Sequence, residues 1–239
     1  MTTKRTPVWK SIETALLHDI AAARYTPGDK LPTETALSHR FGVNRHTVRR
    51  ALASLADQGV VHARRGAGVF VTLTPTDYPI GRRVRFHHNL QAAGHLPERR
   101  MLSAEARGAD AREAEALNLP QGTPLHVCDG LSLSDGQPIA VFRSAFPAER
   151  FADMPAVLGR VHSVTRAFAE HGIADYTRAW TRLTARLASA TQALHLKIRE
   201  GDAILRTDAV NIDPDGTPIE YGRTWFAGDR VTLTLSAES

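Results

Sequence analysis

Residues 41–52 constrain the fold of this chain more than any other stretch. A Phe-Gly turn comes first, and apolar side chains then recur at helical spacing at Val48, Ala51, Leu52 and Leu55. Basic side chains occupy the other faces of this segment, and Asn44 is suited to cap its N-terminus. The pattern predicts a helix with an apolar back and a basic front, a form suited to the major groove of DNA. Taken alone, the segment also fits a solvated basic helix.

The distribution of charge along the chain separates its first third from the rest. Residues 1–72 hold 11 Lys and Arg against 5 Asp and Glu, whereas the remaining residues hold 19 against 20. Such segregation favours a polyanionic partner for the first third alone. The length of 239 residues allows one large or two ordinary domains, and a hydrophobic content of 42% is enough for packed cores.

Several compositional features predict a cytoplasmic protein with no membrane partner. No apolar run approaches the ~20 residues of a membrane span. The first residues lack the apolar core of a signal peptide. The single cysteine, Cys128, has no partner for an internal disulfide, so we expect a reducing compartment and a buried, unreactive thiol.

The first domain is expected to span residues 1–72. Apolar spacing and turn residues predict helices over about 8–24, from Thr33 to Gly42, and over about 44–58. β-Branched runs on both sides of a glycine turn at 66–68 predict a hairpin. Three helices followed by a hairpin form a winged helix-turn-helix. Residues 73–81 contain two prolines and a glycine and are expected to form an extended linker.

Three motifs resemble the GntR family of bacterial transcription regulators: Leu31-Pro-Thr-Glu, Phe41-Gly-Val-Asn-Arg-His-Thr-Val-Arg-Arg-Ala-Leu and Arg65-Gly-Ala-Gly-Val-Phe-Val. The resemblance implies that the third helix contacts bases and phosphates and that the wing tip enters the minor groove of an operator. Arginine can bind the O6 and N7 atoms of guanine together, and a glycine tip lets the backbone approach a groove closely. The candidate DNA-binding residues are Thr33, Arg45, His46, Thr47, Arg49, Arg50, Arg65 and Gly66.

An internal repeat organises the second domain, expected over residues 82–239. Ala114-Glu-Ala-Leu-Asn-Leu119 resembles Thr191-Gln-Ala-Leu-His-Leu196, and Ser134-Asp-Gly-Gln-Pro-Ile139 resembles Pro214-Asp-Gly-Thr-Pro-Ile219. Each copy predicts a short helix, a strand, an Asp-Gly hairpin and a second strand. A helix near 161–171 and a strand over 176–187 are expected between the copies. The predicted fold class is therefore α+β, with helices packed on one antiparallel sheet.

This arrangement resembles the UTRA effector domain of HutC-type GntR regulators, which has the fold of chorismate lyase without its activity. The resemblance is carried by Arg85-Phe-His-His-Asn-Leu, by the alternating arginines of 178–186 and by Pro218-Ile-Glu-Tyr-Gly-Arg-Thr. Within the family, the chain is most similar to regulators of phosphonate metabolism. The resemblance implies a homodimeric repressor controlled by a small-molecule effector bound between the halves of the sheet. The implied effector-binding residues are Phe86, His87, His88, Arg143, Ser163, Glu220, Arg223 and Phe226.

The repeat suggests what kind of effector binds. Arg143 and Arg223 are equivalent in the two copies, so we expect them to converge on an anion such as a phosphonate or a phosphorylated metabolite. His87 and His88 would point to opposite faces of a strand, so no metal is expected, and no cofactor is implied.

Two other functions remain open from the sequence. One is a DNA-binding protein with an enzymatic, chorismate lyase-like domain, although no nucleophile elbow, phosphate loop or metal triad is present. The other is an architectural DNA-binding protein without an effector.

Overall fold

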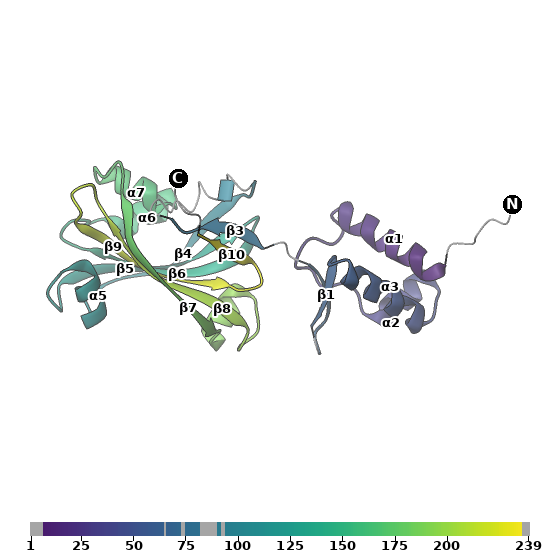
Figure 1. Ribbon diagram of the computed structural model, residues 1–239. Helices are drawn as coiled ribbons and strands as arrows, with labels where there is room; N and C mark the ends of the chain where they lie inside the picture. The colour runs from purple at the N-terminus through teal and green to yellow at the C-terminus, as the bar shows by residue number, and fades with distance from the viewer. Residues whose placement is uncertain (1–6, 65, 73–74, 82–89, 92–93, 236–239) are drawn as a thin grey trace. The chain divides into compact units, whose positions relative to one another are not determined.

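The computed structural model describes residues 7–64, 66–72, 75–81, 90–91 and 94–235. The chain divides into two compact units, Met1–Thr74 and Pro75–Ser239 (Figure 1). In the described part of the chain, none of the helices has the length and apolar character needed to cross a membrane.

The first unit is a winged helix-turn-helix, as the sequence predicted. Its helices are α1 (Val8–Ala21), α2 (Glu34–Phe41) and α3 (Arg45–Asp57). An antiparallel hairpin follows, formed by β1 (Val61–Arg64) and β2 (Gly68–Val71). Its core contains the fully buried side chains of Leu16, Leu37, Val48, Ala51 and Leu55. The apolar back of α3 is thus what holds this helix to the unit.

Local hydrogen bonds fix the ends of α2 and α3. The Thr33 hydroxyl accepts the backbone N–H of Ala36 at 3.2 Å, and the Asn44 side chain accepts that of Thr47 at 2.9 Å. These bonds satisfy N–H groups that have no partner within a helix. Gly42 ends α2 with φ of +65°, a left-handed conformation that glycine adopts without strain. The short turn between the helices is therefore fixed by the sequence itself, as predicted.

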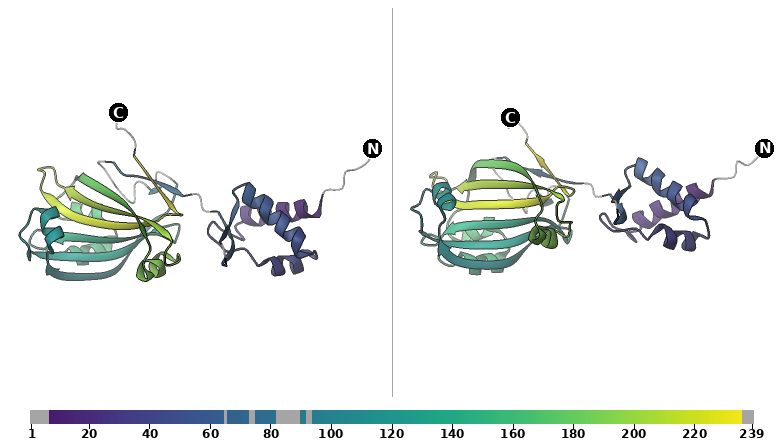
Figure 2. Two further views of the ribbon diagram at one scale, coloured as in Figure 1. Left: turned by 60° about the horizontal axis from the view of Figure 1, so that its bottom comes forward. Right: turned by 90° about the horizontal axis from the view of Figure 1, so that it is seen from below.

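The second unit is built on a six-stranded antiparallel sheet with the strand order β4-β5-β6-β9-β8-β7. Figure 2 shows these strands side by side. They comprise β4 (Pro97–Gly108), β5 (Pro124–Ser134), β6 (Gln137–Pro147), β7 (Thr177–Leu187), β8 (Ala203–Ile212) and β9 (Pro218–Ala227). The repeat predicted from the sequence appears as two three-stranded halves, which meet where β6 pairs with β9.

Different elements cover the two faces of this sheet. Helices α5 (Ala111–Leu117) and α8 (Ala190–Leu196) pack on one face, and each begins with a capping box. Helices α6 (Met154–Val161) and α7 (Val164–Glu170) pack on the other face. The latter, here called the pocket face, also carries a parallel pair formed by β3 (Thr76–Pro79) and β10 (Val231–Thr234). Figure 1 shows α6, α7, β3 and β10 on the same side of the sheet.

Two expectations differ from the structure. Residues 76–79, expected within the linker, form β3, because Tyr78 and Ile80 bury their side chains against the second unit. Two backbone bonds reinforce this strand, from Thr76 N–H to the Arg230 carbonyl and from Ile80 N–H to the Thr234 carbonyl. The helix expected near 161–171 is α7, which begins only at Val164, because the chain turns at residues 162–163, where His162 has φ of +51°. Helix α6, which ends at Val161, was not expected.

Cys128 lies on β5 and is completely buried, as predicted. Burial, together with the negative charges of Asp129 and Glu220, raises the pKa of its thiol to about 12. The thiol therefore stays protonated, and an unreactive buried side chain is the role that the sequence indicated.

Candidate DNA-binding surface and ligand pocket

The exposed side of α3 carries the basic residues that the sequence singled out. Arg45, His46, Arg49 and Arg50 are exposed, whereas Val48 on the same helix is fully buried. This separation follows from the helical period, since buried and exposed positions alternate every three to four residues. The structure thus gives α3 the two unlike faces that were expected.

Arg49 has a fixed orientation that the sequence did not reveal. Its Nε and Nη2 atoms donate to the two carboxylate oxygens of Glu34 on α2, at 3.0 and 2.8 Å. The hydrogen bond from Arg49 holds the pKa of Glu34 below its ordinary value, and Glu34 raises the pKa of Arg49. Such a two-point pair sets the plane of the guanidinium group. Glu34 is therefore a positioning residue for Arg49, and its place in the Leu31-Pro-Thr-Glu motif is the sequence signal for it.

The other candidates on this unit differ in how they are held. The Arg50 guanidinium lies 4.8 Å from the ring of Trp9, and the Thr47 hydroxyl donates to Asn44 at 2.9 Å. Thr33 caps α2. Gly66 has φ of +73° and open space on the side where a side chain would stand. Arg65 lies outside the described residues.

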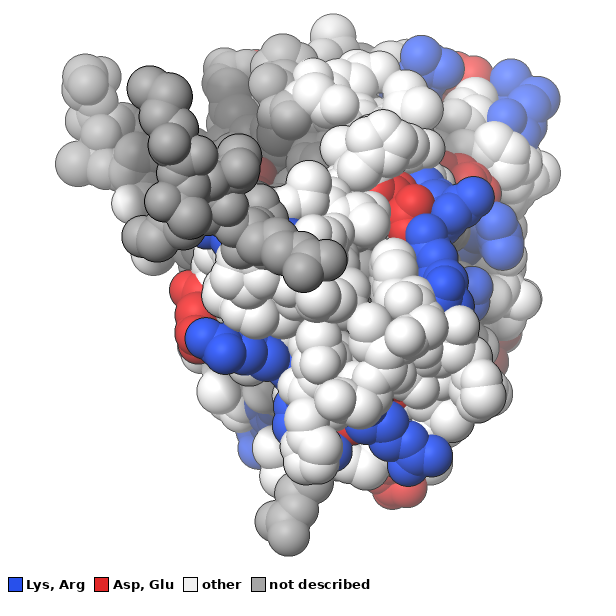
Figure 3. Space-filling model, turned by 90° about the vertical axis from the view of Figure 1, so that its right-hand side faces the viewer, with Lys and Arg blue, Asp and Glu red and all other residues white. Residues whose placement is uncertain are grey.

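Basic side chains do not form one unbroken patch on the face shown in Figure 3. Lysine and arginine side chains lie there singly or in small groups among uncharged atoms, and acidic groups lie beside basic ones. The first unit contains ion pairs of Arg49 with Glu34 and of Arg40 with Asp19.

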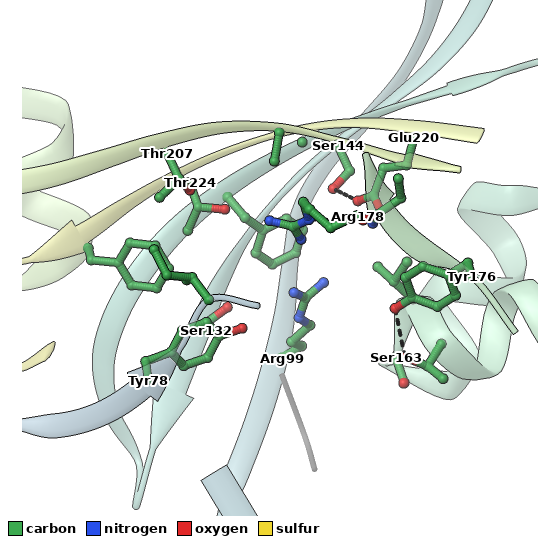
Figure 4. A pocket seen from close by; sticks show the side chains of 18 residues that line it. Tyr78, Arg99, Ser132, Ser144, Ser163, Tyr176, Arg178, Thr207, Glu220 and Thr224 are labelled. Atoms are coloured by element: carbon green, nitrogen blue, oxygen red, sulfur yellow. Dashed lines mark hydrogen bonds between the residues drawn. The ribbon is translucent and has the colours of Figure 1, made fainter. Parts of the chain in front are cut away.

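A pocket opens on the pocket face of the second unit (Figure 4). It is lined by residues from all six strands of the sheet, from β3 and from the start of α7. The space open to the centres of water-sized spheres is about 70 Å³. One water needs about 10–15 Å³ by this measure, so several waters or a small molecule fit. Of the predicted effector residues, Ser163, Glu220 and Phe226 line it; Phe86, His87 and His88 lie outside the described residues.

Among the described residues that line this pocket, two arginines are positively charged. Figure 4 shows Arg99 and Arg178 extending their guanidinium groups into it from different strands. The Arg99 guanidinium lies 4.5 Å from the ring of Phe142, and Arg178 Nε donates to the side-chain oxygen of Asn211 at 3.0 Å. Arg99 on β4 lies opposite Ser132, and Arg178 on β7 lies opposite Asn211. The two arginines thus take matching places on the edge strands of the two halves.

The pocket also contains a carboxylate and a row of hydroxyl groups. Glu220 is 6% exposed, and it accepts hydrogen bonds from Ser144 Oγ and Asn211 Nδ2, both at 2.6 Å. Hydroxyl groups come from Tyr78, Ser132, Ser163, Thr165, Tyr176, Thr207 and Thr224. Burial raises the pKa of Tyr78, and the charges of Arg99 and Arg178 partly oppose this shift. A lining of this kind suits a small polar ligand with several hydrogen-bonding oxygens.

The prediction that Arg143 and Arg223 converge in the ligand pocket is wrong for the pocket described here, because neither lines it. Both point away from the pocket face, because successive side chains on a strand alternate between faces. Arg143 donates to both oxygens of Asp129, at 2.7 and 2.9 Å, and Arg223 Nε donates to Asp208 at 3.1 Å. Both arginines are therefore engaged by carboxylates on the opposite face.

A sequence signal for this correction existed. Glu220 and Arg223 lie three residues apart on one strand, an odd spacing that places them on opposite faces. The arginines that line the pocket from matching places in the two halves are Arg99 and Arg178. Among the residues that the structure describes, no group of three or more His, Cys, Asp and Glu side chains could hold a metal ion.

The fold and these two sites define a protein that combines a DNA-binding unit with a ligand-binding unit. Residues 9–71 match the family of bacterial regulatory proteins known as the gntR family, and residues 92–232 match the UTRA domain. The chain belongs to the GntR family of transcriptional regulators that carry a UTRA domain. It is a transcriptional regulator and not an enzyme.

Individual relatives cover nearly the whole chain. An uncharacterized HTH-type transcriptional regulator of Rhizobium meliloti (strain 1021) is 41% identical over 229 residues, covering 95% of this chain and 94% of that protein. The probable transcriptional regulator PhnF of Escherichia coli (strain K12) is 32% identical, covering 88% of each chain. The crystal structure of PhnF from Mycobacterium smegmatis superposes with a TM-score of 0.67 at 24% identity, over 95% of this chain and 99% of that chain. The last likeness concerns the fold.

Proposed function

We propose that this regulator is a homodimeric repressor whose affinity for a DNA operator is set by a small anionic effector in the pocket of the second unit. A phosphonate or a phosphorylated metabolite is the effector class that fits best. Its oxygens would accept hydrogen bonds from the guanidinium groups and the hydroxyl groups that line the pocket.

The placement of Arg99 and Arg178 is the observation that carries the proposal. Two guanidinium groups and one carboxylate, Glu220, are the charged groups among the described lining residues. The pocket is therefore positive, which favours an anion. The planar guanidinium group of arginine can also donate two parallel hydrogen bonds to two oxygens of one phosphate, a fixed geometry that an ammonium group does not provide.

On the DNA side, the proposal assigns base and phosphate contacts to the exposed face of α3. Arg45, His46, Thr47, Arg49 and Arg50 would contact the major groove and its phosphates, with Thr33 at the start of α2. The wing residues Arg65 and Gly66 would reach the minor groove. One winged helix reads only a few base pairs, so a two-fold dimer on a palindrome multiplies specificity.

The strand β3 offers a route from the effector to the DNA-binding unit. Tyr78 and Ile80 line the pocket, and β3 starts two residues after the end of the first unit. A ligand that contacts Tyr78 would stabilise one position of β3. Residues 73–75 connect β3 to the first unit and would transmit this change in position. An effector acts only if it binds one conformation better than the other, and a change at β3 supplies such a difference.

The proposal is tested by measuring operator affinity in the presence of candidate effectors. DNA fragments selected from a random pool by the full-length protein would be titrated with and without inorganic phosphate, methylphosphonate and glucose 6-phosphate. We expect at least one of these anions to change the dissociation constant about tenfold, and Arg178→Ala to abolish that change. Unchanged affinity with all three, at anion concentrations that saturate the protein, would contradict the proposal.

A further inference from the structure

The charge inside the pocket is divided rather than uniform. Glu220 on β9 is buried and lines the same space as Arg99 and Arg178. Among the described residues, two side chains donate hydrogen bonds to the Glu220 carboxylate. These are Ser144 and Asn211, and both are neutral. Each carboxylate oxygen has two acceptor positions and receives one such bond, so acceptor capacity remains on both oxygens.

Asn211 separates the carboxylate from the neighbouring cation. Its side-chain oxygen accepts from Arg178 Nε at 3.0 Å, while its Nδ2 donates to Glu220 Oε2 at 2.6 Å. The amide thus stands between opposite charges, so that Glu220 is bridged to Arg178 instead of being paired with it directly. A buried carboxylate that lacks a cationic partner is costly. This arrangement places a carboxylate with remaining acceptor capacity and guanidinium groups within one small pocket.

We propose that the effector is a small zwitterion whose oxyanion binds Arg99 and Arg178 and whose ammonium group binds Glu220. The inference deepens the proposed anion-controlled function and rests on it. The formal charges agree: the two arginines and one glutamate among the described lining residues sum to one positive charge, and an aminoalkylphosphonate with a doubly ionised phosphonate carries one negative charge. The limited space restricts the effector to a few non-hydrogen atoms between the charged ends.

The test compares two ligands of nearly equal shape. 2-Aminoethylphosphonate carries the ammonium group, and n-propylphosphonate replaces it with a methyl group. Isothermal titration of the full-length protein should show the amino compound binding at least tenfold more tightly. Glu220→Gln should remove this preference while keeping, or improving, the binding of n-propylphosphonate. Ser144→Ala, the matched control, removes a hydrogen bond to Glu220 but not its charge, so the preference should remain. Thermal melting of each variant verifies folding.

Two outcomes would contradict the proposal that the effector is a zwitterion. Equal affinities of the two ligands for the unmodified protein would show that the ammonium group is not recognised. A Glu220→Gln variant that binds both ligands more weakly by the same factor, and so keeps the preference of the unmodified protein, would show that Glu220 only positions Asn211 and Arg178. In both cases n-propylphosphonate still binds in an Arg178-dependent manner, and the proposed anion-controlled function stands. Failure of both phosphonates and of inorganic phosphate to bind would overturn both.

Discussion

Arg143 and Arg223 lie directly opposite each other on the neighbouring strands β6 and β9, on the face of the sheet away from the pocket. Like charges at such positions repel each other. Here each arginine has a carboxylate on its other side, Asp129 on β5 for Arg143 and Asp208 on β8 for Arg223. The row of charges therefore joins the two halves of the sheet, and we assign these arginines a structural role.

We expect Arg223→Ala to reduce stability without affecting the effector. The substitution removes a hydrogen bond to the buried Asp208 carboxylate, at a cost of about 1–3 kcal/mol in the free energy of unfolding. Urea denaturation measures this loss, and titration with n-propylphosphonate should give an unchanged affinity. Arg178→Ala should behave in the opposite way, with weak anion binding and nearly unchanged stability. A loss of anion affinity in folded Arg223→Ala protein would contradict this division.

The stability of the protein should depend on pH through Asp208. Burial alone would raise the pKa of Asp208, but hydrogen bonds from Arg206, Tyr221 and Arg223 lower it below the ordinary value. The ionised group therefore stabilises the folded state above about pH 4, and this contribution disappears as the pH falls through the lowered pKa. Asp208→Asn should be less stable at pH 7 and should lose less stability between about pH 5 and pH 2.

Denaturation midpoints across this pH range provide the measurement for Asp208. Asp215→Asn, on an exposed turn, is the matched control and should follow the unmodified protein. If Asp208→Asn shows the same acid dependence as the control, the sensitivity arises elsewhere in the chain.

Arg49→Ala should weaken binding to a selected operator by on the order of tenfold or more and relax the preference at one base pair. Glu34→Gln keeps Arg49 but removes the carboxylate that orients it. We expect this variant to lose discrimination between operator and random DNA, while its affinity for random DNA rises because a negative charge is gone. Fluorescence anisotropy at two salt concentrations separates these effects. An equal loss on all sequences for Arg49→Ala would show a contact with phosphate only.

Tyr78→Phe should uncouple the effector from the operator. The hydroxyl is removed from a ring that stays packed against Phe226, with ring centroids 5.4 Å apart. Phosphonate affinity should change only a few-fold, whereas the ratio of operator affinities with and without the ligand should move towards one. Tyr176→Phe is the control, because this pocket hydroxyl bonds to Thr165 and is not on β3. If the two variants alter the ratio equally, β3 has no special part in transmission.

Gly130→Ala should disturb both stability and ligand binding. A Cβ atom at this position would collide with the Phe142 ring and lie 2.6 Å from the Arg100 carbonyl oxygen. Overpacking of this kind costs about 1–3 kcal/mol, and displacement of Phe142 changes the pocket wall. Gly159→Ala, in α6 with open space around it, is the control and should be neutral or stabilising. Differential scanning calorimetry and phosphonate titration measure the two effects.

The sequence by itself determined the elements of both units and their repetition. Helix spacing, the caps at Thr33 and Asn44, the glycine turns and the Asp-Gly hairpins are local signals, because they depend on residues within a few positions of each other. The exposed basic face of α3 follows from the same periodicity. These signals were enough to predict the winged helix-turn-helix, the two-fold repeat of the sheet and the α+β class.

Only the tertiary structure decided which arginines share the pocket. Strand pairing joins residues far apart in the chain, and a shift of one residue moves a side chain to the other face of a sheet. Irregularities in β4 near Met101 and in β7 near Arg178 shift the register at the two edge strands. Strand pairing and its irregularities decide which side chains of each strand point to the pocket face. Arg99 and Arg178 therefore line one pocket, whereas Arg143 and Arg223 lie outside it.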